Sequence, residues 1–339
     1  MKTINKKHKQ TQKQNHSRPQ NVLVLGGKGF IGRYAVKHLA QLGANVIIGT
    51  RKANVPVNAL TKTAAQDQHV CREVALHKLR RVDDLVDVLG DIDVVVNTVG
   101  ILRERWSESY DHVHHQAVKL LAEGCAERGI RFVHISALGL TNPLKSRFTQ
   151  SKLLGEKALP QSNANWAIVR PSLVDGQGGF GARWFRRVAT WPVQFIPATA
   201  NGIFAPIDAD DLGEAIARVA LLQEPERTNS DKVYELGGSE YLNFKEYLNL
   251  LRPNNLAGAV YLPVYSFIAR ALAHVCDVLH ITPYSFGHYE LLKYGSAPTK
   301  NKLATVLGRK PRLVRPHNQE KPYPEVVNIA NVNRVRGET

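Results

Sequence analysis

The stretch Asn21-Val-Leu-Val-Leu-Gly-Gly-Lys-Gly-Phe-Ile-Gly-Arg33 decides the fold of this 339-residue chain. Residues 22–25 are uniformly apolar, which is typical of a strand buried on both faces in a parallel sheet. After the glycines, apolar residues recur at helical spacing up to residue 40. Gly26, Gly29 and Gly32 let the backbone turn tightly and approach a pyrophosphate, whose charge the helix start favours. The stretch therefore predicts a strand, turn and helix that bind a dinucleotide.

The next strand indicates which dinucleotide is bound. Residues 46–50 are mostly apolar and end at Arg51, where sites that prefer NAD present an acidic residue to the ribose. A guanidinium there suits a 2′-phosphate instead, and Arg33 adds positive charge nearby. The sequence thus favours NADP(H), with NAD(H) as the alternative if Arg51 is only a solvated residue at the end of a strand.

The net charge of +16 is concentrated at the ends of the chain. Residues 1–20 carry six Lys and Arg and no acid, and residues 299–339 carry nine against three acids. Such tails indicate contact with an anionic membrane or polyanion, with solvated tails as the plainer alternative. No motif for specific nucleic-acid binding is present. The N-terminus resembles neither a secretory signal nor a transit peptide, so we expect a bacterial cytoplasmic protein, with a peripheral position at the inner membrane surface as an alternative.

The cysteines and histidines predict neither a metal site nor a disulfide. Cys71, Cys125 and Cys276 are far apart and form no CxxC pair. The histidines at 112, 114 and 115 lack the carboxylate-supported spacing of a metal set.

Strand and helix patterns alternate for about two hundred residues, which predicts an α/β fold with a doubly wound parallel (Rossmann) sheet. We divide the chain into a disordered basic tail at 1–20, a Rossmann domain at 21–250, a smaller, mainly helical C-terminal substrate-side region at 251–310, and a basic tail at 311–339. Residues 175–206 mix Gly, Pro and aromatics without a clean period, and are expected to form a substrate-side insertion. The apolar stretch after residue 260 is interrupted by charges, so we expect a helix packed on the domain or lying at a membrane surface, not a membrane span.

In this order the motifs resemble the extended short-chain dehydrogenase/reductases, and in particular their atypical branch, which includes the NADPH-binding accessory subunit of respiratory complex I and its bacterial relatives. The match runs from about residue 21 to residue 310. The motifs that carry it are Gly26-Gly-Lys-Gly-Phe-Ile-Gly32-Arg33, Arg51, Asn97-Thr-Val-Gly-Ile-Leu102, His134-Ile-Ser-Ala-Leu-Gly139, Ser151-Lys152, Gly155-Glu156, Arg170-Pro-Ser172 and Tyr234-Glu-Leu-Gly-Gly238.

The resemblance implies a role for each part of the cofactor site. The glycine turn, with Phe30 and Ile31 between its last two glycines, would hold the pyrophosphate, and Arg51 the adenosine 2′-phosphate. Lys152 would reach the nicotinamide ribose. The adenine-side ribose region and the nicotinamide would be lined by Thr98, Val99, Gly100, Pro171 and Val174.

One departure from the family pattern concerns catalysis. Active members of the superfamily carry a proton-donating tyrosine four residues before the lysine, where this chain has Phe148, and no tyrosine lies between residues 111 and 233. A positioned general acid contributes about 10²–10⁴-fold in rate. Ser136 and, as a relay, His114 are the candidates to replace it. Each also has a plainer interpretation. Ser136 would only cap a turn, and His114 would be a helix histidine whose hydrogen bonds are purely structural.

Two main functional hypotheses follow, and a third, a regulator that senses the NADP redox state through a partner, shares their cofactor-binding half. The first is an NAD(P)H-binding, short-chain dehydrogenase/reductase-like protein that holds NADP(H) with weak or absent hydride transfer and acts in respiratory-complex or quinone metabolism, in peripheral contact with a membrane or membrane complex. The second is an active NADP-dependent reductase or nucleotide-sugar epimerase/dehydratase with a non-tyrosine proton donor. The sequence does not identify the small-molecule substrate.

Overall fold

In the computed structural model, the residues described are 18–51, 70–104, 108–140, 144–222, 228, 231–279 and 286–315. Most of both predicted basic tails lies outside these ranges. The strands of the main sheet are β1 (Asn21–Leu25), β2 (Asn45–Thr50), β3 (Val70–Glu73), β4 (Val94–Asn97), β5 (Arg131–Ile135), β6 (Asn165–Pro171) and β10 (Val233–Leu236). They lie side by side in the order β10-β6-β5-β4-β1-β2-β3, and every pair is parallel. The predicted doubly wound sheet is confirmed.

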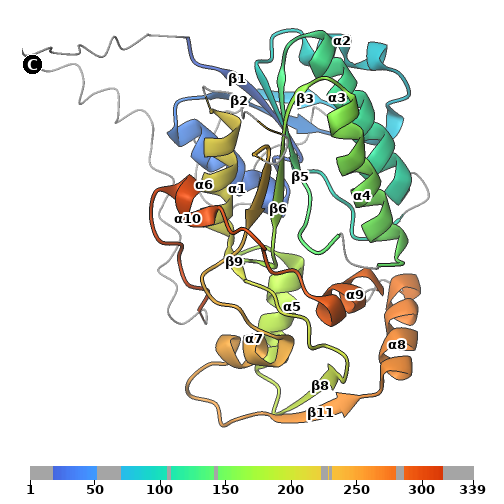
Figure 1. Ribbon diagram of the computed structural model, residues 1–339, viewed down its shortest axis with the longest axis vertical. Coiled ribbons are helices and arrows are strands. Elements are labelled where there is room, and N and C mark those ends of the chain that lie inside the picture. The colour runs from blue at the N-terminus through green and yellow to red at the C-terminus, as the bar shows by residue number, and fades with distance from the viewer. Residues whose placement is uncertain are drawn as a thin grey trace, which may run out of the picture.

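Helices cover both faces of this sheet (Figure 1). One layer contains α1 (Phe30–Gln41), α6 (Ala209–Ala220) and α10 (Leu303–Leu307), and the other contains α2 (Val86–Leu89), α3 (Ala117–Glu127) and α4 (Arg147–Ala158). A hydrophobic core lies on each side, and the central strands contribute alternate side chains to the two, as Val22 and Leu23 do. Because both faces are covered, these strands read as continuous apolar runs.

The helix predicted at 109–128 contains an irregular turn. Residues 112–116 form a π-helical segment, η4 (His112–Gln116), directly before α3. The wider turn lets α4 approach closely, since a Cβ on Gly155 of α4 would lie 2.0 Å from the carbonyl oxygen of His114. π-Helical turns of this kind are frequent at functional sites. Short 3₁₀ segments connect other elements: η2 (Leu76–Lys78), η3 (Val82–Leu85) and η5 (Leu159–Gln161).

A smaller body lies beyond the carboxyl ends of the strands (Figure 1). Its elements are β7 (Val174–Asp175), α5 (Phe180–Ala189), β8 (Val193–Pro197), β9 (Ile207–Asp208), α7 (Phe244–Leu251), β11 (Val260–Val264), α8 (Ser266–Leu279) and α9 (Phe286–Tyr294). The prediction of no regular period in 175–206 was wrong, because α5 and β8 lie there. Rings from α5 and α7 fix this helix: Phe185 packs edge-on against Phe244 and Tyr247. No helix of the described residues is long and apolar enough to cross a bilayer.

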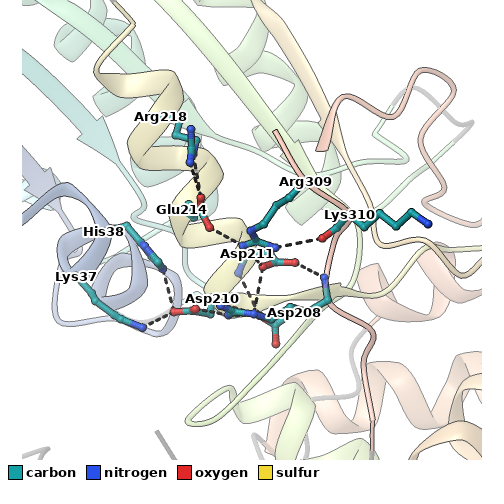
Figure 2. A network of polar contacts seen from close by, with 10 residues as sticks. Lys37, His38, Asp208, Asp210, Asp211, Glu214, Arg218, Arg309 and Lys310 are labelled. Atoms are coloured by element: carbon teal, nitrogen blue, oxygen red, sulfur yellow. Dashed lines mark hydrogen bonds and ion pairs between the residues drawn. The ribbon is translucent and has the colours of Figure 1, made fainter. Parts of the chain in front are cut away.

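An ion-pair network fastens the segment after α10 to the Rossmann layer (Figure 2). Arg309 donates to the carboxylate of Asp211, which is fully buried in α6, at 2.7 Å. Arg312 pairs with Asp210, which also accepts from Lys37 and His38 of α1. Burial alone would raise the pKa of Asp210, but its hydrogen bonds to His38, Arg312 and Lys37 lower it. The end of the described chain is thus held against α1 and α6.

Candidate cofactor cleft

The glycine turn between β1 and α1 has the shape that a pyrophosphate requires. Gly26 has φ +76°, and the amide of Gly29 donates to its carbonyl at 2.7 Å. A Cβ on Gly32 would lie 2.1 Å from the oxygen of Gly26, so only glycine fits there. The residue before α1 is Gly29, which has no side chain to cap the helix. The first amides of α1 are therefore left to an anionic ligand.

A glycine-rich segment, residues 176–179, closes one side of this turn. The guanidinium of Arg33 donates to the carbonyl of Gln177 and lies 5.3 Å above the ring of Tyr34. A Cβ on Gly179 would lie 2.7 Å from the ring of Phe30. Ile31 packs into the core behind the turn. Arg33 thus holds this neighbouring loop against α1.

Arg51 lies at the carboxyl end of β2, beside an acidic partner from elsewhere in the chain. Its Nη1 lies 3.1 Å from Oε1 of Glu108. The side chain of Arg51 is 66% exposed, whereas that of Glu108 is only 11% exposed. His77 lies 3.9 Å from the same carboxylate. The end of β2 therefore presents an exposed cation and, beside it, a largely buried carboxylate that pairs with that cation.

The segment after β4, residues 98–100, lies beside the glycine turn and forms part of the candidate site. The hydroxyl of Thr98 donates to the carbonyl of Leu25 at 2.7 Å, and the amide of Val99 donates to Oδ1 of Asn97 at 3.1 Å. A Cβ on Gly26 would lie 2.9 Å from Oγ1 of Thr98. These contacts bring residues 98–100 against the glycine turn.

Lys152 of α4 lies close to the same segment. A Cβ on Gly100 would lie 3.8 Å from its Nζ, and the ammonium lies 5.9 Å from the centre of the Phe148 ring. Within the described residues, no hydrogen bond to this ammonium is found. Burial lowers the pKa of Lys152 to about 8, against an opposing effect of Glu156. A buried cation without an acceptor fits a ligand that brings oxygen atoms, such as a ribose.

Phe148 occupies the tyrosine position and is enclosed by rings. Tyr110 lies 5.7 Å from it and His114 lies 5.5 Å from it, both edge-on, and the two partners stack on each other. We call Tyr110, His114 and Phe148 the ring cluster. A Cβ on Gly287 of α9 would lie 3.1 Å from Cδ1 of Phe148. Phe148 itself brings no hydroxyl to this position, and the hydroxyl of Tyr110 donates to the carbonyl of Leu102 at 2.7 Å.

Both ring nitrogens of His114 already have partners. Its Nε2 accepts from the amide of Ile101 at 3.0 Å, and its Nδ1 lies 3.0 Å from Oγ of Ser151. The Ser151 hydroxyl donates to the carbonyl of Phe148, so it accepts from Nδ1. Burial, and then the neighbouring charges of Lys152 and His134, lower the pKa of His114 well below its usual value. This geometry fits a neutral, structural histidine better than a proton relay.

Ser136 follows β5 at the same edge of the sheet. Its hydroxyl is buried, and no hydrogen-bond partner is found for it among the described residues. On β5 itself, Nδ1 of His134 lies 3.3 Å from the side-chain nitrogen of Asn97, while its Nε2 is buried without a partner in the described part. Burial, and then Lys152, lower the pKa of His134 to about 3. Oγ of Ser136 and Nε2 of His134 are therefore two buried polar atoms without a hydrogen-bond partner among the described residues.

Pro171 and Val174 lie further along this edge. Pro171 ends β6, and its carbonyl accepts from the amide of Leu138 at 3.0 Å. Val174 begins β7, which pairs with β9. Beneath them, Arg170 forms an ion pair with the buried carboxylate of Glu156. A cavity of about 450 Å³ opens beyond Ser136, between residues 137–140 and 293–299.

The structure adds three residues to which the sequence analysis gave no role. Glu108 and Tyr110 lie in the connection between β4 and α3, and nothing local in the sequence marks them as partners of Arg51 and Phe148. His134 had a signal, because it is a polar residue inside an apolar strand.

Comparison with known proteins assigns the family. The model of the NAD dependent epimerase/dehydratase family matches residues 22–237, well over half of the chain. The chain belongs to this family. The family binds NAD(P), and the predicted resemblance to extended short-chain dehydrogenase/reductases is confirmed.

Several individual proteins are similar to this chain in sequence or in fold. NADH dehydrogenase (ubiquinone) 1 alpha subcomplex subunit 9 of Dictyostelium discoideum is 27% identical over 230 residues, which cover 67% of this chain and 62% of the relative. The chain thus spans less than two thirds of that protein. A nucleoside-diphosphate-sugar epimerase of Staphylococcus aureus has a similar fold, with a TM-score of 0.67 at 14% identity, covering 89% of this chain and all of that one. The triphenylmethane reductase of Citrobacter sp., solved with NADP(H), has a TM-score of 0.63 at 17% identity, covering 91% and 99%.

Proposed function

We propose that this protein holds NADP(H) and transfers hydride weakly or not at all. The observation that carries the proposal is Phe148, which stands in the ring cluster beside Lys152 while the glycine turn keeps its full geometry. The bound cofactor supplies hydride chemistry. The chain's residues bind and orient it: the glycine turn and the start of α1 hold its pyrophosphate, Arg51 its 2′-phosphate and Lys152 its nicotinamide ribose.

Cofactor binding is tested on the purified full-length protein. Mass spectrometry of the released ligand is expected to find NADP⁺ or NADPH. Added NADPH at 100 times its Kd should stabilise the emptied protein by about 2.7 kcal/mol. If no nicotinamide nucleotide is released and neither NADPH nor NADH raises the melting temperature, the proposal is wrong.

The absence of hydride transfer is tested with Phe148→Tyr. The ammonium of Lys152 lies over this ring, so an added hydroxyl would stand near a cation that favours proton release. We expect NADPH affinity within twofold of wild type and a gain of slow NADPH oxidation with a panel of soluble quinones and aldehydes. Phe180→Tyr, on an exposed ring of α5, is the matched control. Fast oxidation by wild type that is unchanged or lowered in Phe148→Tyr would contradict the proposal.

A second candidate is an active reductase or nucleotide-sugar epimerase/dehydratase that uses Ser136 as proton donor. It is supported by the buried Ser136 hydroxyl, which has no partner among the described residues, and by the lowered pKa of Lys152. This candidate predicts turnover that falls by about 10²–10⁴-fold in Ser136→Ala. Ser162→Ala, in a surface turn, should keep full turnover. Equal activity in both variants would remove Ser136 from the mechanism.

We also propose peripheral contact with a membrane or a membrane-bound respiratory complex, with a role in respiratory-complex or quinone metabolism. Support comes from the basic tails and from the relative named as a subunit of NADH dehydrogenase (ubiquinone). In a fractionated cell lysate, the protein should pellet with membranes at low salt and be released by alkaline carbonate. Recovery entirely in the supernatant at low salt would refute this part.

A further inference from the structure

Helix α8 presents its apolar side chains to solvent. Among residues 266–276, the part of this helix whose side chains the structure describes, only the small residues Ala269 and Ala273 are buried. Its polar residues Arg270 and His274 are exposed as well, and each contacts the ring of Phe286 on α9. The exposed apolar side chains of this helix are Phe267, Ile268, Leu272 and Val275. A surface helix usually has its large apolar residues turned inward instead.

The neighbouring two-stranded sheet continues this apolar surface. In β8 and β11, Val193 is paired with Val260 and Phe195 with Leu262, and all four side chains are exposed. Because side chains alternate along a strand, these four share the outer face of the sheet. β8, β11 and α8 together form one end of the molecule, far from the layer of α1 and α6 (Figure 1). We call the exposed apolar residues of these three elements, with Tyr265 between them, the apolar end.

The most exposed residues of the apolar end protrude at its corner. Tyr265 and Phe267, at the junction of β11 and α8, are each 71% exposed, and their rings stack at 6.2 Å. Two stacked rings that protrude in this way can be buried only by a surface that deforms around them. A lipid bilayer does so, whereas a folded partner would need a matching hollow. Aromatic residues with one polar edge are also enriched at membrane interfaces.

The charges around the apolar end suit an anionic surface. Residues 176–207 and 247–276, which contain α5, β8, β11 and α8 up to Cys276, include no Asp or Glu, and Asp277 is the one acidic residue of α8. They do include arginines, of which Arg183, Arg187 and Arg270 are exposed. Lys245 lies 4.5 Å from the ring of Tyr261 in β11. Arginines beside an apolar face are typical of segments that lie in the surface of an anionic bilayer.

We propose that the apolar end inserts into the headgroup region of an anionic lipid bilayer. Phe267, Leu272 and Phe195 enter the acyl boundary, and the exposed arginines contact lipid phosphates. This specifies the surface behind the membrane contact proposed above, and it is independent of whether the cleft holds NADP(H).

The test measures co-sedimentation of the full chain with vesicles of phosphatidylcholine containing 30% phosphatidylglycerol. Measurement at both 0.1 M and 1 M NaCl separates the contributions, because at 1 M the Debye length is only about 3 Å and the attraction of the basic tails is screened. We expect wild type to bind at both concentrations. Phe267→Ser with Leu272→Ser should bind about thirtyfold more weakly, which corresponds to about 2 kcal/mol for two partly exposed side chains.

The matched control is Leu42→Ser with Val86→Ser, two side chains that are each 50% exposed elsewhere on the surface. It should bind vesicles as wild type does. A cooperative thermal melt verifies that each variant is folded, and the shift of that melt by NADPH reports on the cofactor site separately from vesicle binding. If the α8 variant fails to fold, Phe195→Ser in β8 replaces it, with an expected loss of about fivefold or more.

Three outcomes would overturn the proposal. The first is that wild type does not bind these vesicles. The second is that wild type and the α8 variant bind equally well at 0.1 M NaCl and that 1 M NaCl abolishes the binding of both. The third is self-association of wild type in solution that the α8 variant loses without any change in vesicle binding, which would make the apolar end an interface between copies. Phosphatidylcholine vesicles without phosphatidylglycerol should bind more weakly, and equal binding would remove the arginines from the proposal.

Discussion

Replacing Glu108 with glutamine is expected to strengthen NADPH binding about fivefold and to leave NADH binding within twofold. The reason lies in the pair at the end of β2, where Oε1 of Glu108 lies 3.1 Å from Nη1 of Arg51. A 2′-phosphate that binds Arg51 must share the guanidinium with this carboxylate and tolerate its negative charge. Glutamine has nearly the same shape without the charge, so it removes both costs.

The exposure of Arg51 sets the size of the effect. Its side chain is 66% exposed, so water and salt screen the pair, and its net contribution is about 1 kcal/mol or less. If the interaction of Arg51 with the 2′-phosphate gains this free energy, the affinity for NADPH rises about fivefold. NADH carries a hydroxyl in place of the phosphate and has little to gain from an unshared guanidinium.

Fluorescence titration of the emptied protein at 0.1 M ionic strength measures both affinities. Arg51→Met should weaken NADPH about tenfold or more, because a hydrogen bond to a charged group contributes about 1.5–3 kcal/mol. Asp91→Asn is the control. Its carboxylate pairs with Arg72 at a distance of 2.8 Å, and this pair lies outside the cleft. Weaker NADPH binding in Glu108→Gln, or an equal gain for NADH, would show that Arg51 does not bind the 2′-phosphate.

Three further predictions concern the cleft and the stability of the fold. Gly32→Ala should abolish the NADPH-induced thermal shift, because its Cβ would clash with the backbone of Gly26. Gly90→Ala should keep the shift, because the atom nearest to its added Cβ lies 3.7 Å away. His134 has a pKa of about 3 in the folded protein against 6.5 unfolded, so unfolding takes up a proton between these values and stability falls as pH drops through this window. Urea unfolding at pH 7 and pH 5 should therefore show about 2 kcal/mol less acid destabilisation in His134→Gln than in wild type, and equal destabilisation in both would refute the assignment. Arg309→Met should cost about 1–2 kcal/mol in urea unfolding at pH 7, because it removes a partly exposed cation from a buried carboxylate, and an unchanged midpoint would show that the network in Figure 2 does not hold the chain end.

The sequence predicted the main sheet because its signals are local. The apolar runs of β1, β4 and β5 are consequences of burial on both faces, and the turn after β1 needs glycine wherever it occurs. The prediction failed where distant contacts decide the structure. Helix α5 was missed because the rings of α7, some sixty residues away, fix it, and its own residues bury only Ala182, Val188 and Ala189.

The same distinction applies to the site. Arg51 and Lys152 could be predicted because each stands at a fixed position relative to a strand or a motif. Glu108 could not, since it lies 57 residues from Arg51 and meets it only through the fold. The π-helical turn at His112–Gln116 could not be predicted either, because its sequence reads as ordinary helix and the close approach of Gly155 is a tertiary contact.

Binding and chemistry depend on different parts of this molecule, so one can be lost without the other. The glycine turn acts through backbone geometry and the helix start, and a change at residue 148 does not alter either. Proton transfer depends on a single ring, and the ring cluster puts an apolar group there, with both nitrogens of His114 already bonded. Without a donor beside the lysine, a bound nicotinamide would keep its hydride even when a carbonyl is near. If the two proposals hold, the cleft would keep a reduced cofactor intact, and the apolar end would place the protein at a membrane surface.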